Sequence, residues 1–155
     1  MPYRDSASFG KRQEFVTIAE LLRRGFDVYL TLVDDLQIDC VIRQEVNREP
    51  VYLDVQIKAR SLKANKRNAG TFAALEVRHP RKNFFFIFYS EQAGSYWVMP
   101  SLDLVKEANR NKTGANKGKY RIVFTNHSRR TGEVRPRPRF DRYRNNFEML
   151  RNYRG

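Results

Sequence analysis

The chain has 155 residues, 41% of them hydrophobic and 13% aromatic, so it is long enough for one folded domain and too apolar to be disordered throughout. Thirty Lys and Arg residues against seventeen Asp and Glu residues give a formal net charge of +13. A strong excess of positive charge is typical of domains that bind nucleic acids. The composition therefore favours a folded nucleic-acid-binding protein.

Membrane and secreted classes are not favoured. No apolar run approaches the ~18 residues of a membrane-spanning helix, and the first ten residues lack the apolar core of a signal peptide. The single cysteine, Cys40, has no partner for an internal disulfide and lies in an apolar strand pattern, which is typical of a reduced core residue. We therefore expect a cytoplasmic protein without a membrane partner.

The first sixty residues predict a helix followed by three strands. Apolar residues at helical spacing predict a helix up to about residue 24, and Gly25 ends it. The predicted buried stripe of this helix comprises Phe15, Ile18, Ala19 and Leu22. Strands are predicted over 26–33, 36–43 and 51–59, with a turn at Asp34-Asp35 and a polar hairpin loop over 44–49.

The remaining chain alternates apolar strands with basic loops. The run from Phe84 to Tyr89 is long, aromatic and continuous, which predicts a strand buried on both faces. Further predictions are a basic loop over 61–71, a strand at 96–99, a helix over 101–109, a basic loop over 110–119, a strand over 120–124 and a helical stretch within 140–153. These elements indicate a single α/β domain over 1–155, with a central mixed β-sheet flanked by helices and a basic C-terminal extension over 125–155.

Polar side chains share one face of two neighbouring predicted strands. Because side chains alternate along a strand, Asp39 projects from the second strand and Gln56 and Lys58 from the third. Mg²⁺ prefers oxygen ligands, usually one or two carboxylates together with waters and a phosphate oxygen. Asp39 can be the central ligand, Gln56 offers a carbonyl oxygen, and Lys58 can orient or deprotonate an attacking water. Glu14 borders the buried helix stripe and can hold a metal through water.

These residues also have structural interpretations. Glu14 can pair with a basic neighbour on the helix or face solvent, and a surface glutamine such as Gln56 is common. Asp39 is harder to explain in this way, because a carboxylate among apolar neighbours needs a partner or a metal. Asp54 faces the same side as Gln56 and is a secondary candidate ligand.

The order of these motifs resembles that of the PD-(D/E)XK nuclease superfamily. A helix with Glu14, the strand 38–42 and the segment 55–58 are similar to the core of its restriction-endonuclease-like fold. Two positions depart from the pattern: Ile38 stands where proline is common, and Gln56 replaces the acidic residue before the lysine. The chain looks most like the group I intron homing endonucleases of this superfamily. The resemblance implies a site-specific DNA endonuclease using Mg²⁺, or another divalent cation such as Mn²⁺, with Glu14, Asp39, Gln56 and Lys58 as its site.

Basic residues in two loops and in the tail are the expected contacts to double-stranded DNA. They are Arg60, Lys63, Lys66, Arg67, Lys112, Lys117, Lys119, Arg135, Arg137 and Arg139. Prolines between the last three arginines predict an extended arm of the kind that enters a minor groove. Cutting both strands with one site per chain needs two subunits or sequential nicking, so we expect a homodimer or homotetramer.

Two other functions stay open at this point. The chain can be a Holliday-junction resolvase, which shares the same superfamily fold. It can also be a non-catalytic nucleic-acid-binding module on that fold, in which the acidic residues are structural. Substrate preference and metal-dependent cleavage distinguish the three.

Overall fold

The computed structural model describes residues 3–33 and 36–155, so the predicted turn at Asp34-Asp35 lies outside the described residues. The helices are α1 (Tyr3–Arg23), η1 (Lys66–Asn68), α2 (Ser101–Glu107), η2 (Pro138–Tyr143) and α3 (Glu148–Arg151), of which η1 and η2 are 3₁₀ helices. The strands are β1 (Asp27–Leu30), β2 (Cys40–Val46), β3 (Glu49–Arg60), β4 (Thr71–Leu75), β5 (Phe84–Ser90), β6 (Ser95–Pro100), β7 (Asn109–Arg110), β8 (Tyr120–Val123), β9 (Thr125–His127) and β10 (Val134–Pro136). Within the described ranges no helix has the length and hydropathy needed to cross a membrane.

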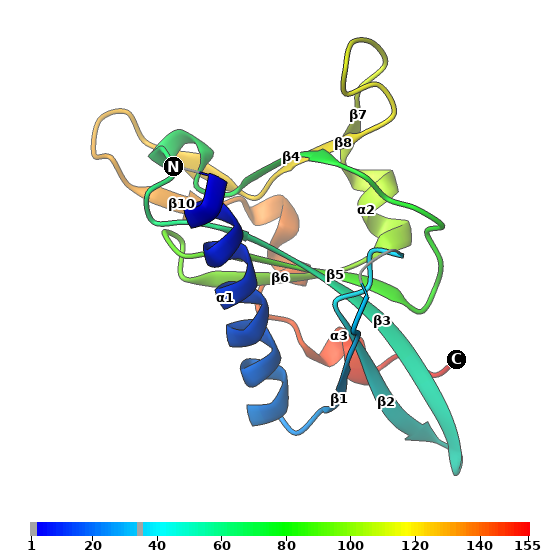
Figure 1. Cartoon of the computed structure of the whole chain (residues 1–155). Helices are drawn as coiled ribbons and strands as arrows, with labels where there is room; N and C mark the ends of the chain where they lie inside the picture. The colour runs from blue at the N-terminus through cyan, green and yellow to red at the C-terminus, as the bar shows by residue number, and fades with distance from the viewer. Residues whose placement is uncertain (1–2, 34–35) are drawn as a thin grey trace.

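A five-stranded mixed sheet forms the centre of the molecule (Figure 1). Its strand order is β1-β2-β3-β5-β6, with β3 and β5 parallel and the other neighbours antiparallel. Helices α1 and α3 pack on one face, and the smaller sheet β4-β8-β7 packs with α2 and η2 on the other. This arrangement confirms the predicted single α/β domain with a mixed central sheet flanked by helices.

The central sheet separates two hydrophobic cores, and β5 contributes to both. Phe85 and Ile87 belong to the core under α1 and α3, whereas Phe84, Phe86 and Phe88 belong to the core under the small sheet. All five side chains are buried, which confirms the prediction from the aromatic run. Parallel pairing with β3 then places this buried strand directly beside the one that carries the predicted site residues.

The β2–β3 hairpin is longer than predicted. Asn47 and Arg48 form its turn, and both have positive φ, 54° and 67°, as in the type I′ turns that match strand twist. The ladder therefore extends to Val46 and Glu49, through most of the predicted polar loop. At the other end β2 begins only at Cys40, so the prediction of strand from residue 36 was wrong.

The buried side of helix α1 shares Ile18 with the predicted stripe but is otherwise different. Its buried residues are Phe9, Gln13, Thr17, Ile18 and Leu21. Phe15 and Leu22 of the predicted stripe are 52% and 54% exposed. Gln13 is buried because its amide donates to Glu91 Oε1 at 2.7 Å, so tertiary partners outweigh the apolar pattern. Gly25 ends the helix as predicted, with φ of 86°.

The C-terminal residues complete the domain. Strand β10 pairs with β9, Arg137 is also extended, and η2 begins at Pro138, so the prediction of an extended arginine arm was wrong only from Pro138 onward. The buried apolar residues of this part of the chain are Phe140, Tyr143, Phe147 and Leu150. Because they enter both cores, the basic segment 125–155 is integrated into the fold.

Candidate active site and nucleic-acid interface

The four predicted catalytic residues lie around one small pocket at the end of β2. Glu14, Asp39, Gln56 and Lys58 line it, and its volume is about 290 Å³. The pocket takes its side chains from α1, from the residue before β2 and from β3. We refer to it as the Asp39 pocket. The structure thus brings the four residues together, while their chemical roles stay predictions.

Backbone hydrogen bonds fix Asp39 in this pocket. Its amide donates to Val55 O at 2.8 Å, and its carboxylate Oδ2 accepts from the amide of Ile57 at 2.6 Å. The residue is only 9% exposed. A carboxylate held in this way has one oxygen oriented by the protein and cannot rotate freely towards solvent. It therefore meets the positional requirement of a metal ligand or an electrostatic group.

Gln56 is the buried member of the set. It is 5% exposed, and its carbonyl oxygen Oε1 has no hydrogen-bond partner among the described residues. A buried carbonyl without a partner costs roughly 1–3 kcal/mol. A cation in the pocket would remove that cost, so the orphaned oxygen fits a divalent metal. Lys58 follows two residues later on the same side of β3 and is partly exposed.

Glu14 reaches the pocket from α1 and already has a basic neighbour. Its Oε2 lies 3.1 Å from Lys11 Nζ, one of the pairings expected from the sequence. Gly10, one turn earlier, also lines the pocket and leaves open space where a side chain would stand. Glu14 is therefore placed to act at the rim of the pocket, through water or on a second cation.

The pKa of the buried Cys40 thiol reflects the negative charge of this region. Burial, together with the nearby carboxylates of Asp39 and Glu14, raises the pKa of Cys40 to about 12. In the described ranges no three His, Cys, Asp or Glu side chains are grouped as a metal site. The polar oxygens that line the Asp39 pocket are those of two carboxylates, Asp39 and Glu14, and of the Gln56 amide.

Asp54 does not belong to this site. Its carboxylate forms an ion pair with Arg81, and it does not line the Asp39 pocket. The side chain lies on the same face of β3 as Gln56 but two residues earlier. There the segment before β5 covers it. The secondary candidate from the sequence is accounted for by this structural pairing.

Some of the predicted DNA contacts are exposed, and others already have partners within the protein. Lys63, Lys112 and Lys117 are exposed in loops, and Lys66 is exposed at the start of η1. Arg60 donates from Nε to Asn68 O at 3.3 Å, Arg135 pairs with Glu133 at 2.6 Å, and Lys119 Nζ is 3.9 Å from Glu76. The remaining three, Arg67, Arg137 and Arg139, line a common pocket.

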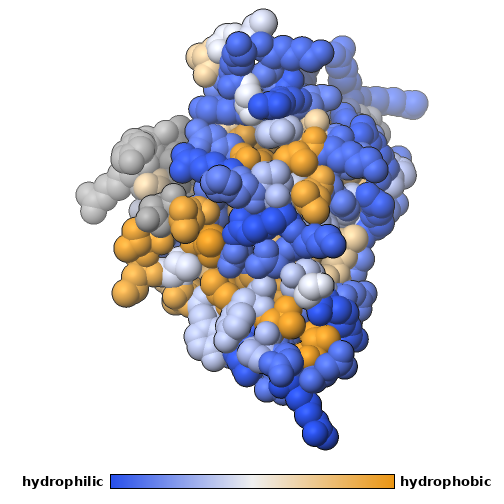
Figure 2. Space-filling model, turned by 90° about the vertical axis from the view of Figure 1, so that its right-hand side faces the viewer, coloured by the Kyte–Doolittle hydropathy of each residue, from blue (hydrophilic) through white to orange (hydrophobic). Residues whose placement is uncertain are grey.

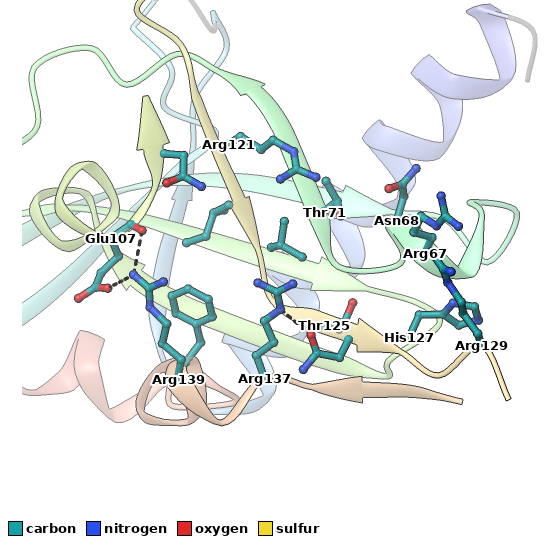
Figure 3. Close-up of a pocket in the computed structure, with 15 residues that line it drawn as sticks. Arg67, Asn68, Thr71, Glu107, Arg121, Thr125, His127, Arg129, Arg137 and Arg139 are labelled. Carbon is teal, nitrogen blue, oxygen red and sulfur yellow. Dashed lines mark hydrogen bonds and ion pairs between the residues drawn. The ribbon is translucent and has the colours of Figure 1, made fainter. Parts of the chain in front are cut away.

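Five arginines line that pocket, and we call it the arginine pocket. Its volume is about 400 Å³, and it lies between η1, the small sheet, β9 and η2. The arginines that line it are Arg67, Arg121, Arg129, Arg137 and Arg139. Figure 3 shows Arg121 above and Arg137 below its middle, with Arg67 and Arg129 at one end and Arg139 beside Glu107 at the other.

Sequence reasoning assigned two of these arginines to other places. Arg121 falls in the strand predicted over 120–124, and Arg129 falls in the predicted basic extension over 125–155. Antiparallel pairing of β4 with β8 and of β9 with β10 brings both to one hollow. The local signal for Arg121 is its alternation with the buried Ile122, which turns the arginine outward from the small sheet.

Comparison with known proteins supports the fold. The sequence matches no protein-family model, and a search among curated proteins finds no relative either. Among solved structures, one described as that of a bacterial homing endonuclease, I-Ssp6803I, is similar with a TM-score of 0.60 and 22% sequence identity. The similarity covers 92% of this chain and 90% of that chain. The two proteins therefore share one fold over almost their whole length.

Proposed function

We propose that the chain is a divalent-metal-dependent endonuclease that hydrolyses phosphodiester bonds of double-stranded DNA at specific sites, as a homing endonuclease does. The observation that carries the proposal is the convergence of Asp39, Gln56 and Lys58 on one pocket with an orphaned buried carbonyl. The net charge of +13, the arginine pocket and the similarity to a homing endonuclease structure agree with it. The motif order resembles PD-(D/E)XK nucleases.

Each pocket residue has a defined part in this proposal. Asp39 and Gln56 would hold Mg²⁺ or Mn²⁺ through their oxygens, with Glu14 at the rim. The bound ion would supply Lewis-acid polarisation of the scissile phosphate and a more acidic water. Lys58 would orient the water for attack and offset negative charge on the phosphate. Asp39 keeps its orientation through the Ile57 amide.

Metal removal and loss of Lys58 test this proposal. Purified protein should nick or linearise supercoiled plasmid in the presence of Mg²⁺, and a chelator should stop cleavage completely. Lys58→Ala should slow cleavage by about 10²–10⁴-fold, which is the range for loss of a general acid or base. Lys106→Ala is the matched control, because Lys106 is exposed on α2, outside the Asp39 pocket and outside the predicted DNA contacts. Cleavage that persists in chelator would contradict the proposal.

Two observations favour a second function, a nucleic-acid-binding module without catalysis. Gln56 replaces a second carboxylate on β3, and Glu14 is already paired with Lys11. Tight plasmid binding without cleavage in either Mg²⁺ or Mn²⁺ would support this function instead. Preference for a four-way junction over linear duplex in the same assay would identify a junction resolvase.

We further propose that the protein is a homodimer or homotetramer, built through an exposed apolar face. Figure 2 shows hydrophobic side chains gathered beside the segment that joins β1 to β2. The residues of this apolar face are Leu30 of the edge strand β1 and Leu32, Val33 and Leu36 beyond it. Together they expose on the order of 500 Å², more than half of the ~800 Å² that each partner buries in an interface of standard size.

A second copy of this chain is the occupant that this face fits. The four side chains carry no charge, whereas 30% of all residues in the chain are charged, so two copies can meet here without bringing their positive surfaces together. The double variant Leu30→Glu/Leu32→Glu should sediment as a monomer in analytical ultracentrifugation. Leu62→Glu, at a side chain 66% exposed outside the face, should leave the mass unchanged. A wild-type monomer at every concentration would contradict the proposal.

A further inference from the structure

The arginine pocket carries more positive charge than the protein itself neutralises. Arg139 is paired with Glu107, at 2.8 Å, the single carboxylate that lines the pocket in the described structure. Arg137 donates from Nε to the neutral amide oxygen of Asn126 at 2.9 Å. Within the described ranges the side chains of Arg67, Arg121 and Arg129 have no carboxylate or hydrogen-bond partner. Cations gathered in a hollow without counter-charge form an anion site.

The neutral groups in the pocket suit phosphate oxygens. Guanidinium groups match a phosphate in a bidentate way, and amides and hydroxyls complete such contacts to nucleic-acid backbones. Thr125 at the pocket wall is 3% exposed, and its Oγ1 has no partner among the described residues. The volume of about 400 Å³ is more than ten times the ~30 Å³ of a water molecule. The pocket therefore has space for a phosphate together with its neighbouring sugars.

One short segment joins this pocket to the Asp39 pocket. Lys58 and Ala59 at the end of β3 line the Asp39 pocket. The next residue, Arg60, donates to the carbonyl of Asn68, and Asn68 lines the arginine pocket. A ligand that occupies both places must carry several anionic groups along one chain. A nucleic-acid backbone has this form, whereas a single free phosphate fills one place only.

We propose that the arginine pocket binds backbone phosphates of duplex DNA at a distance from the point of cleavage. This inference rests on the proposed nuclease function. Arg67, Arg121 and Arg129 provide the free charges, and Arg137 adds its unengaged guanidinium nitrogens. Arg139 contributes little, because Glu107 already neutralises it. The pocket thus holds the duplex while the Asp39 pocket acts on it.

Salt dependence of binding tests the pocket without requiring cleavage. The affinity for a fluorescein-labelled 30-bp duplex is measured by anisotropy in chelator over a range of KCl concentrations. Each phosphate contact that is lost should make the slope of log K against log salt shallower by about 1. The triple variant Arg67→Ala/Arg121→Ala/Arg129→Ala should therefore show a slope shallower by about 3. Arg154→Ala, which removes an exposed charge outside the pocket, should keep the wild-type slope.

Three results would overturn the proposal. A triple variant with the wild-type slope would show that the duplex does not use the pocket. Inorganic phosphate or a mononucleotide that binds by calorimetry in the wild type but not in the triple variant, with duplex binding unchanged, would identify a site for free phosphate. Arg121→Lys should retain the slope, because it keeps the charge. If Arg121→Lys instead changes only the preference among duplex sequences, Arg121 contacts a base and the backbone assignment fails.

Failure of this proposal and failure of the nuclease function are distinguishable. Plasmid cleavage in Mg²⁺ is measured on the same preparations. A shallower slope in the triple variant without any cleavage by the wild type would support the pocket and overturn the nuclease function. Cleavage by the wild type with an unchanged slope in the triple variant would support the nuclease function and overturn the proposal for the arginine pocket.

Discussion

Asp39→Asn is expected to reduce plasmid cleavage by on the order of 10³-fold, the scale for loss of a key electrostatic group in an active site. The substitution removes the charge that a divalent cation requires. It keeps the shape of the side chain and an oxygen that can still accept from the amide of Ile57. Folding should therefore be preserved, and the loss should appear in the rate at saturating DNA, measured from initial rates of nicking in Mg²⁺.

Asp54→Asn is the matched control for this experiment. Asp54 is a carboxylate on β3, the strand that pairs with β2 next to Asp39, but it pairs with Arg81 and lies outside the Asp39 pocket. Its variant should cleave within a few-fold of the wild type. Equal rates for wild type and Asp39→Asn would contradict the site, and equal losses in Asp39→Asn and Asp54→Asn would indicate a general effect of charge in this part of the sheet.

Phe124→Ala is expected to lower the free energy of unfolding by about 3–5 kcal/mol. Phe124 is fully buried and stacks on Trp97 with ring centroids 4.8 Å apart. It also contacts the rings of Phe88 and Phe140, at 5.0 and 5.1 Å, so it joins the central sheet to the C-terminal segment. Removing it opens a cavity between layers that cannot approach each other. Urea unfolding followed by circular dichroism measures the change.

Leu102→Ala is the control for this stability measurement. Leu102 is 42% exposed on α2, and its variant should change the free energy of unfolding by no more than about 0.5 kcal/mol. A loss below about 1 kcal/mol for Phe124→Ala would show that the layers repack around the gap. The expected loss is a large share of the roughly 5–15 kcal/mol that stabilises a typical domain.

Local sequence patterns predicted much of the fold, and non-local partners decided the rest. The aromatic run over 84–89 could be assigned to a buried strand because its length and composition have few other interpretations. In α1, however, apolar residues occur on more than one side. The buried row is chosen by contacts such as Gln13 with Glu91, which lies 78 residues away. Periodicity within the helix contains no information about that partner.

The same distinction applies to the two pockets. Asp39, Gln56 and Lys58 could be grouped from the sequence because hairpin alternation places them on one side of adjacent strands. The arginine pocket could not be predicted in this way. Its members lie on η1, β8, the β9–β10 turn and the segment before η2, which meet only after β4 pairs with β8.

Side chains of β8 alternate between the exposed surface of the small sheet and the buried core beneath it. Arg121 is exposed at the arginine pocket, while the adjacent Ile122 is buried in the aromatic core. Outward positions can therefore be exchanged during evolution without disturbing the layer beneath them. Gln56, in contrast, is enclosed on β3 in the interior. Under the proposed function, ligand preference can diversify on the small sheet while the residues of the Asp39 pocket stay constant.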